Sequence, residues 1–260
     1  MDHRPQAWGR PRDDMYGAYD PSFLHSSGPK QATQAPIVTG TSVLALKFKD
    51  GVIMAADNLA SYGSLARFTD TKRLRQFGNA AVVGFSGDVS DMQYLDRQLN
   101  ELEIEESYGG ELSLNAANLH NYLGKLFYNR RNKFNPLWNQ VLVAGFDADD
   151  KPFLAAADLR GTTFSAPSLA TGYGAAMAQP IMRRYAETEE QVAALSQEEA
   201  IKIVRECMKV LYYRDARSLD KYSLAVITKD GGVTISTTEE LEKQSWAFAD
   251  RIRGYGTQTV

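Results

Sequence analysis

Two apolar runs on either side of Asp50-Gly51 place the strongest constraint on how this chain can fold. The runs cover residues 42–48 and 52–57. An Asp-Gly pair between such runs is a strong short-range signal for a β-hairpin. The hairpin would place Thr41 at the start of one strand and Asp57 near the end of its partner. We therefore expect a buried hairpin close to the start of the folded domain.

The rest of the chain continues the pattern of strands and helices. Further strands are expected at 80–86, 139–146, 152–158, 222–228 and 233–236, and helices at 89–104, 114–131, 174–188 and 197–213. Ser196 and Glu199 form a capping-box pattern at the start of the last helix. Asp230-Gly231-Gly232 is a second hairpin signal. Two sheets packed face to face, with helix pairs outside, would bury all the apolar faces.

Charge and residue usage exclude several function classes. The formal net charge is -3 and the sequence pI is about 5.7, which argues against a basic nucleic-acid surface. No apolar run approaches the roughly 18 residues of a membrane helix, and the first thirty residues lack a hydrophobic signal core. Cys207 is the only cysteine, so no internal disulfide is possible and a reducing compartment fits. We expect Cys207 to be buried on the apolar side of its helix.

Histidine usage leaves little material for a catalytic triad or a metal site. Only His3, His25 and His120 are present, and the first two lie in the N-terminal segment. We read His120 as an ordinary helix residue and expect no metal and no cofactor.

Three segments are expected along the chain. Residues 1–32 contain four prolines among polar residues and glycines, which is typical of a disordered extension or a propeptide. Residues 33–238 form the folded domain. Residues 239–260 form a polar tail, yet it carries the large apolar side chains of Trp246, Phe248 and Ile252.

The stretch from Gly40-Thr41 to Asp57 resembles the opening of a proteasome beta subunit. Further blocks, from Gly84 to Asp88, from Asn135 to Asn139 and from Val210 to Ser218, extend the resemblance from about Thr33 to Ser236. It implies an α+β fold, the four-layer αββα sandwich of the N-terminal-nucleophile hydrolases.

The resemblance also implies a role for each matched residue of the site. Thr41 matches the threonine nucleophile, Asp57 the aspartate that partners the active-site lysine, and Gly87 the oxyanion-hole glycine. Asp215 and Ser218 match the supporting aspartate and serine. A threonine nucleophile needs a proton acceptor and a donor for the developing oxyanion, which such residues supply.

Three residues depart from the pattern of active members. Arg73 replaces the lysine, and an arginine stays charged and cannot act as a base. Tyr173 stands where active members carry serine, and Phe85 falls where the specificity pocket is lined. The matched residues also fit a purely structural interpretation, in which Asp57 and Arg73 form an ion pair and Gly87 is a strand-to-helix turn.

The resemblance therefore implies a non-catalytic subunit of the proteasome beta ring, located in the cytoplasm and nucleus. Its partners would be the other alpha and beta subunits of a 28-subunit core and the assembly chaperones, with neither nucleic acid nor membrane bound. Two alternatives stay open. One is an active threonine endopeptidase that uses Thr41, and the other is a different N-terminal-nucleophile hydrolase acting on a small amide.

The resemblance carries two expectations for the ends of the chain. A neighbouring active subunit would trim the extension near Ala32-Thr33, leaving Thr41 internal. The tail would reach the opposing beta ring through Trp246, Phe248 and Ile252. The alternative for the tail is that these side chains fold back on their own domain.

Overall fold

The hairpin expected at Asp50-Gly51 is present in the computed structural model, which describes residues 35–78, 81–109 and 114–252. Strands β2 (Val43–Phe48) and β3 (Gly51–Asp57) pair antiparallel, with Phe48 opposite Gly51. A Cβ atom on Gly51 would lie 1.9 Å from the carbonyl oxygen of Ile227 on the neighbouring strand. Glycine is therefore required here by close approach of a second backbone.

The hairpin lies inside a five-stranded antiparallel sheet. Its order is β11-β2-β3-β12-β13, and the three added strands are β11 (Ser168–Ala170), β12 (Lys221–Thr228) and β13 (Gly232–Glu240). The second predicted hairpin is confirmed, because Thr228 pairs with Gly232 across its turn. Gly232 has a φ of 63°, a conformation that glycine adopts without strain.

The other sheet has eight strands. Seven of them follow the order β10-β9-β8-β7-β1-β4-β5, and the eighth, β6, pairs with residues 81–84 of β7. Their bounds are β1 Val38–Gly40, β4 Ala60–Tyr62, β5 Leu65–Phe68, β6 Leu74–Phe77, β7 Ala81–Asp88, β8 Asn139–Phe146, β9 Pro152–Ala157 and β10 Thr163–Ser165. Strand β1 lies between β4 and β7, although it is only three residues long.

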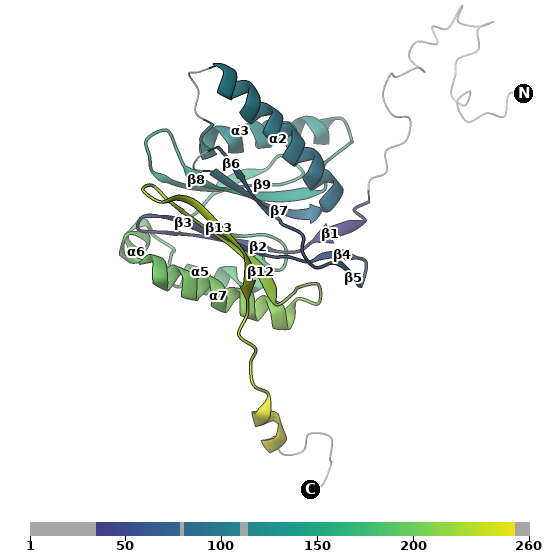
Figure 1. Ribbon diagram of the computed structural model, residues 1–260, viewed down its shortest axis with the longest axis vertical. Helices are drawn as coiled ribbons and strands as arrows, with labels where there is room; N and C mark the ends of the chain where they lie inside the picture. The colour runs from purple at the N-terminus through teal and green to yellow at the C-terminus, as the bar shows by residue number, and fades with distance from the viewer. Residues whose placement is uncertain (1–34, 79–80, 110–113, 253–260) are drawn as a thin grey trace, which may run out of the picture. The chain divides into compact units, whose positions relative to one another are not determined.

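The two sheets face each other and helices cover their outer faces (Figure 1). Helices α2 (Val89–Gly109) and α3 (Ala116–Asn132) pack on the eight-stranded sheet. Helices α4 (Gly174–Met177), α5 (Gln179–Arg183), α6 (Glu189–Ala194) and α7 (Gln197–Arg214) cover the five-stranded sheet. A third apolar cluster fills the space between the sheets. The expected α+β, four-layer αββα sandwich is confirmed.

Local signals explain where the helices begin and end. The predicted capping box is present, since Ser196 and Glu199 bond each other's backbone at the start of α7. The single helix predicted at 174–188 is wrong. It is divided into α4 and α5, with Ala178 between them and Pro180 in the first turn of α5, a position that proline favours.

Among the described residues, no helix is long and apolar enough to cross a membrane. The expected extension 1–32 lies outside the described residues. Strand β13 continues to Glu240 and Leu241 is buried, so the first three residues of the expected tail 239–260 are part of the folded domain. The rest of the described tail includes a short 3-10 helix, η3 (Ala247–Arg251).

Candidate functional site

Thr41 lies where the chain passes from one sheet to the other, between β1 and β2. Its hydroxyl donates a hydrogen bond to the Asp215 carboxylate, with 2.5 Å between Oγ1 and Oδ2. Its nitrogen is in a peptide bond with Gly40, the last residue of β1. Thr41 is therefore an internal residue in this chain, with no free α-amino group to assist its hydroxyl.

Arg73 lies beside Thr41 at the centre of the site, and its side chain is only 1% exposed. A guanidinium has five N–H donors, and all five are used here. Nε donates to Asp57 O at 3.0 Å, Nη1 to Thr41 O at 2.8 Å and Phe85 O at 3.0 Å, and Nη2 to Ser42 O at 2.9 Å and to the Asp57 carboxylate. The arginine thus connects backbone from both sheets.

The predicted ion pair between Asp57 and Arg73 is confirmed, and both side chains are almost completely buried. Burial raises the pKa of the Asp57 carboxyl above its ordinary value, while the charge and hydrogen bond of Arg73 act in the opposite direction. Neither partner can accept the proton of Thr41. An arginine does not deprotonate in proteins, and the Thr41 hydroxyl donates to Asp215 rather than to Asp57.

Asp215 and Ser218 are both at the end of α7, but only Asp215 contacts Thr41. Asp215 follows the last residue of the helix and also accepts the backbone N–H of Arg217 at 3.0 Å. The Ser218 hydroxyl donates to the carbonyls of Leu211 and Asp215 at 3.1 and 2.8 Å. Ser218 therefore completes the end of the helix, where carbonyls lack partners.

Gly87 is held between two strands, opposite Gly40 of β1 on one side and Asn139 of β8 on the other. Its φ is 94°, and an added Cβ would lie 2.1 Å from the carbonyl oxygen of Trp138. Strand β7 ends at the next residue and α2 follows directly. Gly87 therefore lies within β7, two residues before the helix begins, in a backbone conformation that favours glycine.

Strand β1 occupies the gap between β4 and β7 immediately before Thr41. Gly40 pairs with Gly87 and Val38 with Tyr62, so both edges of β1 have a neighbour. The backbone N–H of Ile37 donates to Asp88 at 3.0 Å. Gly87, the residue predicted to supply the oxyanion donor, thus lies opposite Gly40 of the chain's own strand β1.

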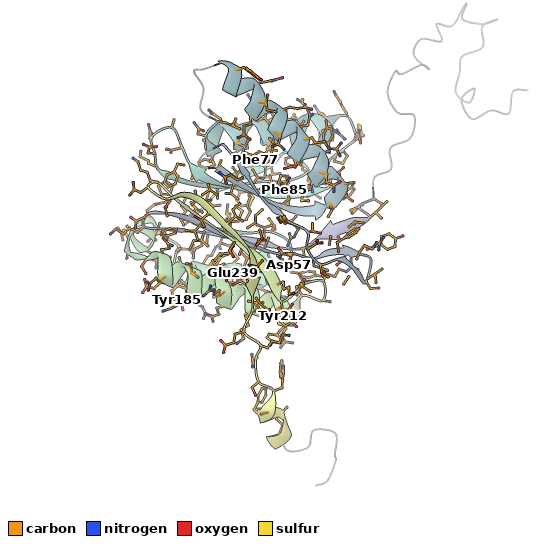
Figure 2. The ribbon with its side chains drawn as sticks, in the orientation of Figure 1. Asp57, Phe77, Phe85, Tyr185, Tyr212 and Glu239 are labelled. Atoms are coloured by element: carbon orange, nitrogen blue, oxygen red, sulfur yellow. The ribbon has the colours of Figure 1, made fainter. Side chains whose placement is uncertain are left out.

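Phe85 and Tyr173, the two aromatic residues that depart from the pattern of active members, lie in different surroundings. Phe85 is 1% exposed and packs in the cluster beneath α2 and α3 together with Phe77, and Figure 2 labels both rings on that side of the sheet. The prediction that Phe85 lines a specificity pocket is therefore wrong, because its side chain points to the outer face of β7. Tyr173 immediately precedes α4 and is 60% exposed.

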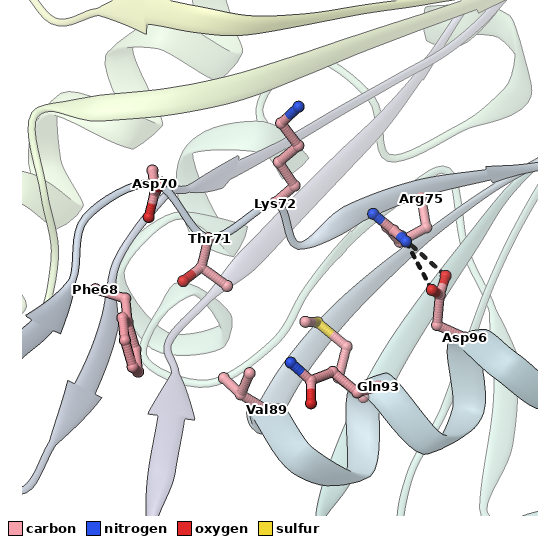
Figure 3. Close-up of a pocket in the computed structure, with 9 residues that line it drawn as sticks. Phe68, Asp70, Thr71, Lys72, Arg75, Val89, Gln93 and Asp96 are labelled. Atoms are coloured by element: carbon pink, nitrogen blue, oxygen red, sulfur yellow. Dashed lines mark hydrogen bonds and ion pairs between the residues drawn. The ribbon is translucent and has the colours of Figure 1, made fainter.

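A pocket of about 410 Å³ lies between β5, the segment before β6, and the first turns of α2 (Figure 3). It is lined by Phe68, Asp70, Thr71, Lys72, Arg75, Val89, Met92, Gln93 and Asp96. Arg75 and Asp96 form a two-bond ion pair at its wall, with distances of 2.8 and 2.6 Å. None of its lining residues belongs to the cluster of Thr41, Asp57, Arg73 and Asp215.

Sequence reasoning missed several polar residues that hold the backbone around the cluster of Thr41, Asp57, Arg73 and Asp215. The Ser42 hydroxyl accepts the backbone N–H of Gly174 at 2.9 Å, and the Thr171 hydroxyl accepts that of Val43 at 2.7 Å. Asp88 accepts the backbone N–H of Asp91 in the first turn of α2, at 3.0 Å. Only Asp88 had a local signal, since an aspartate before a helical pattern is a common N-cap.

The described residues contain no group of three or more His, Cys, Asp or Glu side chains that could hold a metal ion. Ala32 and Thr33, the expected processing site, lie outside the described residues. In the tail, the backbone N–H of Gln244 donates to the Tyr213 hydroxyl at 2.7 Å, and the Trp246 ring meets the Tyr213 ring edge-on at 5.5 Å. Trp246, Phe248 and Ile252 remain 56%, 51% and 49% exposed.

The αββα sandwich, with a threonine at the start of its central hairpin, is the fold of the proteasome beta subunits that the sequence resembles. The comparison with protein families gives the same class. Residues 37–227 match the family model described as proteasome subunit, so the chain belongs to the proteasome subunit family.

Individual relatives named beta type-7 and beta type-4 are similar to this chain over most of its length. The chain is 50% identical to the probable proteasome subunit beta type-7 of Schizosaccharomyces pombe, over 98% of this chain and 97% of that protein. It is 45% identical to proteasome subunit beta type-7 of Saccharomyces cerevisiae over the full length of both. Proteasome subunit beta type-4 of Xenopus laevis is 42% identical over 90% of this chain and 96% of that protein.

Proposed function

We propose that this chain is a non-catalytic subunit of the proteasome beta ring, of the kind named beta type-7 or beta type-4 in its relatives. The observation that carries the proposal is the buried, fully hydrogen-bonded Arg73 beside Thr41, because an arginine cannot accept the proton of the Thr41 hydroxyl. The chain would complete the ring and enclose the chamber in which other subunits degrade proteins.

Its partners would be the other alpha and beta subunits of the core particle, helped by assembly chaperones, in the cytoplasm and nucleus. A closed ring needs every position filled by a surface that fits its two neighbours. A subunit can therefore lose its own chemistry and still be required for assembly.

The ends of the chain would serve that assembly. We place trimming near Ala32-Thr33, upstream of Thr41, because self-cleavage at Gly40-Thr41 would need the base that Arg73 cannot supply. The tail would contact the opposing beta ring. Its exposed apolar side chains support this role, whereas the Tyr213 contacts account only for how the tail begins.

The test is a Thr41→Ala substitution in the assembled particle. We expect every peptide-hydrolysing activity to match that of the unchanged particle, at equal particle concentration. A particle treated with an active-site inhibitor serves as the positive control for loss of activity. The proposal is wrong if one activity falls selectively while assembly is intact.

A second candidate function is an active threonine endopeptidase. One observation favours it, since the Thr41 hydroxyl already has a carboxylate acceptor in Asp215. It requires a mature chain that begins at Thr41, so the intact mass of the chain purified from the particle distinguishes the two functions.

A further inference from the structure

Another pocket, of about 420 Å³, lies at the end of the sandwich where the β2–β3 hairpin turns. Its walls come from the hairpin, from the turn between β8 and β9, and from α6. Figure 1 shows α6 at the opposite side of the domain from β1, the strand that precedes Thr41. We call this the hairpin pocket, and it is separate from the cluster of residues around Thr41.

Lys47 is an unusual residue in the wall of the hairpin pocket. It is the only charged residue of β2, and the other five residues of the strand are buried. Side chains alternate along a strand, so Lys47 lies on the same face as Val43 and Ala45, which pack between the two sheets. The Lys47 side chain therefore lies at the open end of the space between the sheets, and only 16% of it is exposed.

The charge of Lys47 has only a distant partner among the described residues. Its Nζ lies 4.0 Å from Oε1 of Glu189, which is beyond hydrogen-bond distance, and the Glu189 side chain is 78% exposed. Asp147 is the other carboxylate of the lining, and it accepts the backbone N–H groups of Asp149 and Lys151 at 2.9 Å each. Asp147 thus holds its own turn, and the Lys47 ammonium keeps its hydrogen-bonding capacity for a ligand.

Two further lysines line the same pocket. Lys49 is exposed and forms no ion pair with another described residue. The Nζ of Lys151 lies 3.8 Å from an Asp149 oxygen, but both side chains are more than 70% exposed, and such surface pairs contribute little. The pocket therefore presents three ammonium groups that can bind a carboxylate through charge-assisted hydrogen bonds.

The inner surface of the pocket is apolar. Leu154 and Val192 are 1% and 6% exposed, and Phe153 is half-buried beside them. A volume of about 420 Å³ is within the usual range of ligand sites, roughly 300–1,000 Å³. The pocket thus has room for a carboxylate together with an apolar group.

We propose that the hairpin pocket binds acidic peptide segments in which a carboxylate lies beside an apolar side chain. The lysines would hold the carboxylate and the apolar floor would hold the neighbouring side chain. Two carboxylates in the lining, from Asp147 and Glu189, disfavour a phosphate group with its higher charge. This site goes beyond the proposed function, because completing a ring does not require a ligand.

The experiment uses the core particle with the full-length chain assembled in it and with its peptidases blocked by an active-site inhibitor. The probe is a tripeptide, acetylated and amidated at its ends, with a photoreactive benzoylphenylalanine between two glutamates. After irradiation, mass spectrometry of the digested chains locates the photoproduct, which we expect on segments 47–49, 147–154 or 189–193. A matched peptide with glutamines should give at least about tenfold less product there, because it lacks the charges that the lysines bind.

Substitutions test whether Lys47 carries the site. Lys47→Gln should lower the yield of the glutamate peptide at least about tenfold, whereas Lys47→Arg keeps the charge and should lower it less. The matched control is Lys125→Gln on α3, which removes the same charge from a different pocket and should leave the yield unchanged.

Three results would overturn the proposal. One is equal product from the glutamate and glutamine peptides on the unchanged particle, a comparison that needs no variant to fold. The others are a photoproduct confined to segments outside the hairpin pocket, and an unchanged yield in Lys47→Gln.

Discussion

Thr41 and Asp215, 174 positions apart in the sequence, are joined by a hydrogen bond of 2.5 Å from hydroxyl to carboxylate. The bond ties the start of the central hairpin to the end of α7. Asp215 is 4% exposed, so its carboxylate depends on the few donors that reach it.

Replacing Thr41 with valine keeps the shape of the side chain and removes this donor. We expect the free energy of unfolding of the full-length chain to fall by about 1.5–3 kcal/mol, the usual contribution of a hydrogen bond to a charged group. Denaturant unfolding measures the change. Thr41→Ser, which keeps the hydroxyl, is the matched control and should lose clearly less. Equal losses in the two variants would mean that the hydrogen bond contributes little.

Arg73→Lys keeps the positive charge but reduces the donors from five to three. At least two of the buried acceptors around residue 73 then lack a partner. We expect about 1–3 kcal/mol of destabilisation for each, seen as a lower denaturation midpoint.

The same variant tests whether lysine alone restores self-processing. We expect the chain to keep Gly40 joined to Thr41, because Tyr173, a second departure from the pattern of active members, is still present. Intact mass of the Arg73→Lys chain gives the answer. A product that starts at Thr41 would show that the arginine by itself prevents cleavage.

The Cys207 thiol should be unreactive in the folded chain. It is buried in α7, and burial raises its pKa to about 12. Since the thiolate is the reactive form, so high a pKa leaves almost no reactive thiolate at neutral pH. Because it is the only cysteine, labelling with a thiol reagent reports on this residue alone. Denatured chain is the control, and rapid labelling of the native chain would contradict the prediction.

Deleting residues from Gln244 onward should leave the domain folded and slow the joining of half-particles. The tail's large apolar side chains are about half exposed in the isolated chain, and burying each in a neighbour would contribute about 1.5–3 kcal/mol. Native gels of cells that carry only the truncated chain should show half-particles accumulating.

A point substitution distinguishes the hydrogen bond that holds the start of the tail from the apolar side chains further along it. Tyr213→Phe removes only the hydroxyl that accepts the Gln244 amide, and it should slow assembly less than changing Trp246, Phe248 and Ile252 together to alanine. Normal assembly in the triple variant would exclude a role for these side chains in joining the rings.

The parts of the fold that were predictable from sequence are those with local signals. The Asp50-Gly51 hairpin and the Ser196–Glu199 capping box were both readable because each signal spans a few neighbouring residues. The pairing of Asp57 with Arg73 followed from the family pattern, in which a cation faces that aspartate.

What the sequence could not show depends on contacts between distant segments. Strand β1 has three residues and no periodicity, and its neighbours β4 and β7 lie elsewhere in the chain. Phe85 was misplaced by one face of its strand, because alternating residues point to opposite sides of a sheet and β7 is apolar on both. The close approach of Gly40 to the Arg73 side chain, where an added Cβ would lie 2.4 Å from Cδ, also has no local sequence signal.

The position of β1 also bears on the order in which the chain can fold. Hairpin β4–β5 has no other strand neighbour than β1 in the described ladder, which runs β7-β1-β4-β5. Contacts between residues far apart in sequence form late, because closing the intervening loop costs entropy. The Gly40–Gly87 pairing spans such a loop, so one end of the eight-stranded sheet must wait for β7 to be in place. A nascent chain that has emerged only as far as β5 would therefore carry an unfinished sheet edge.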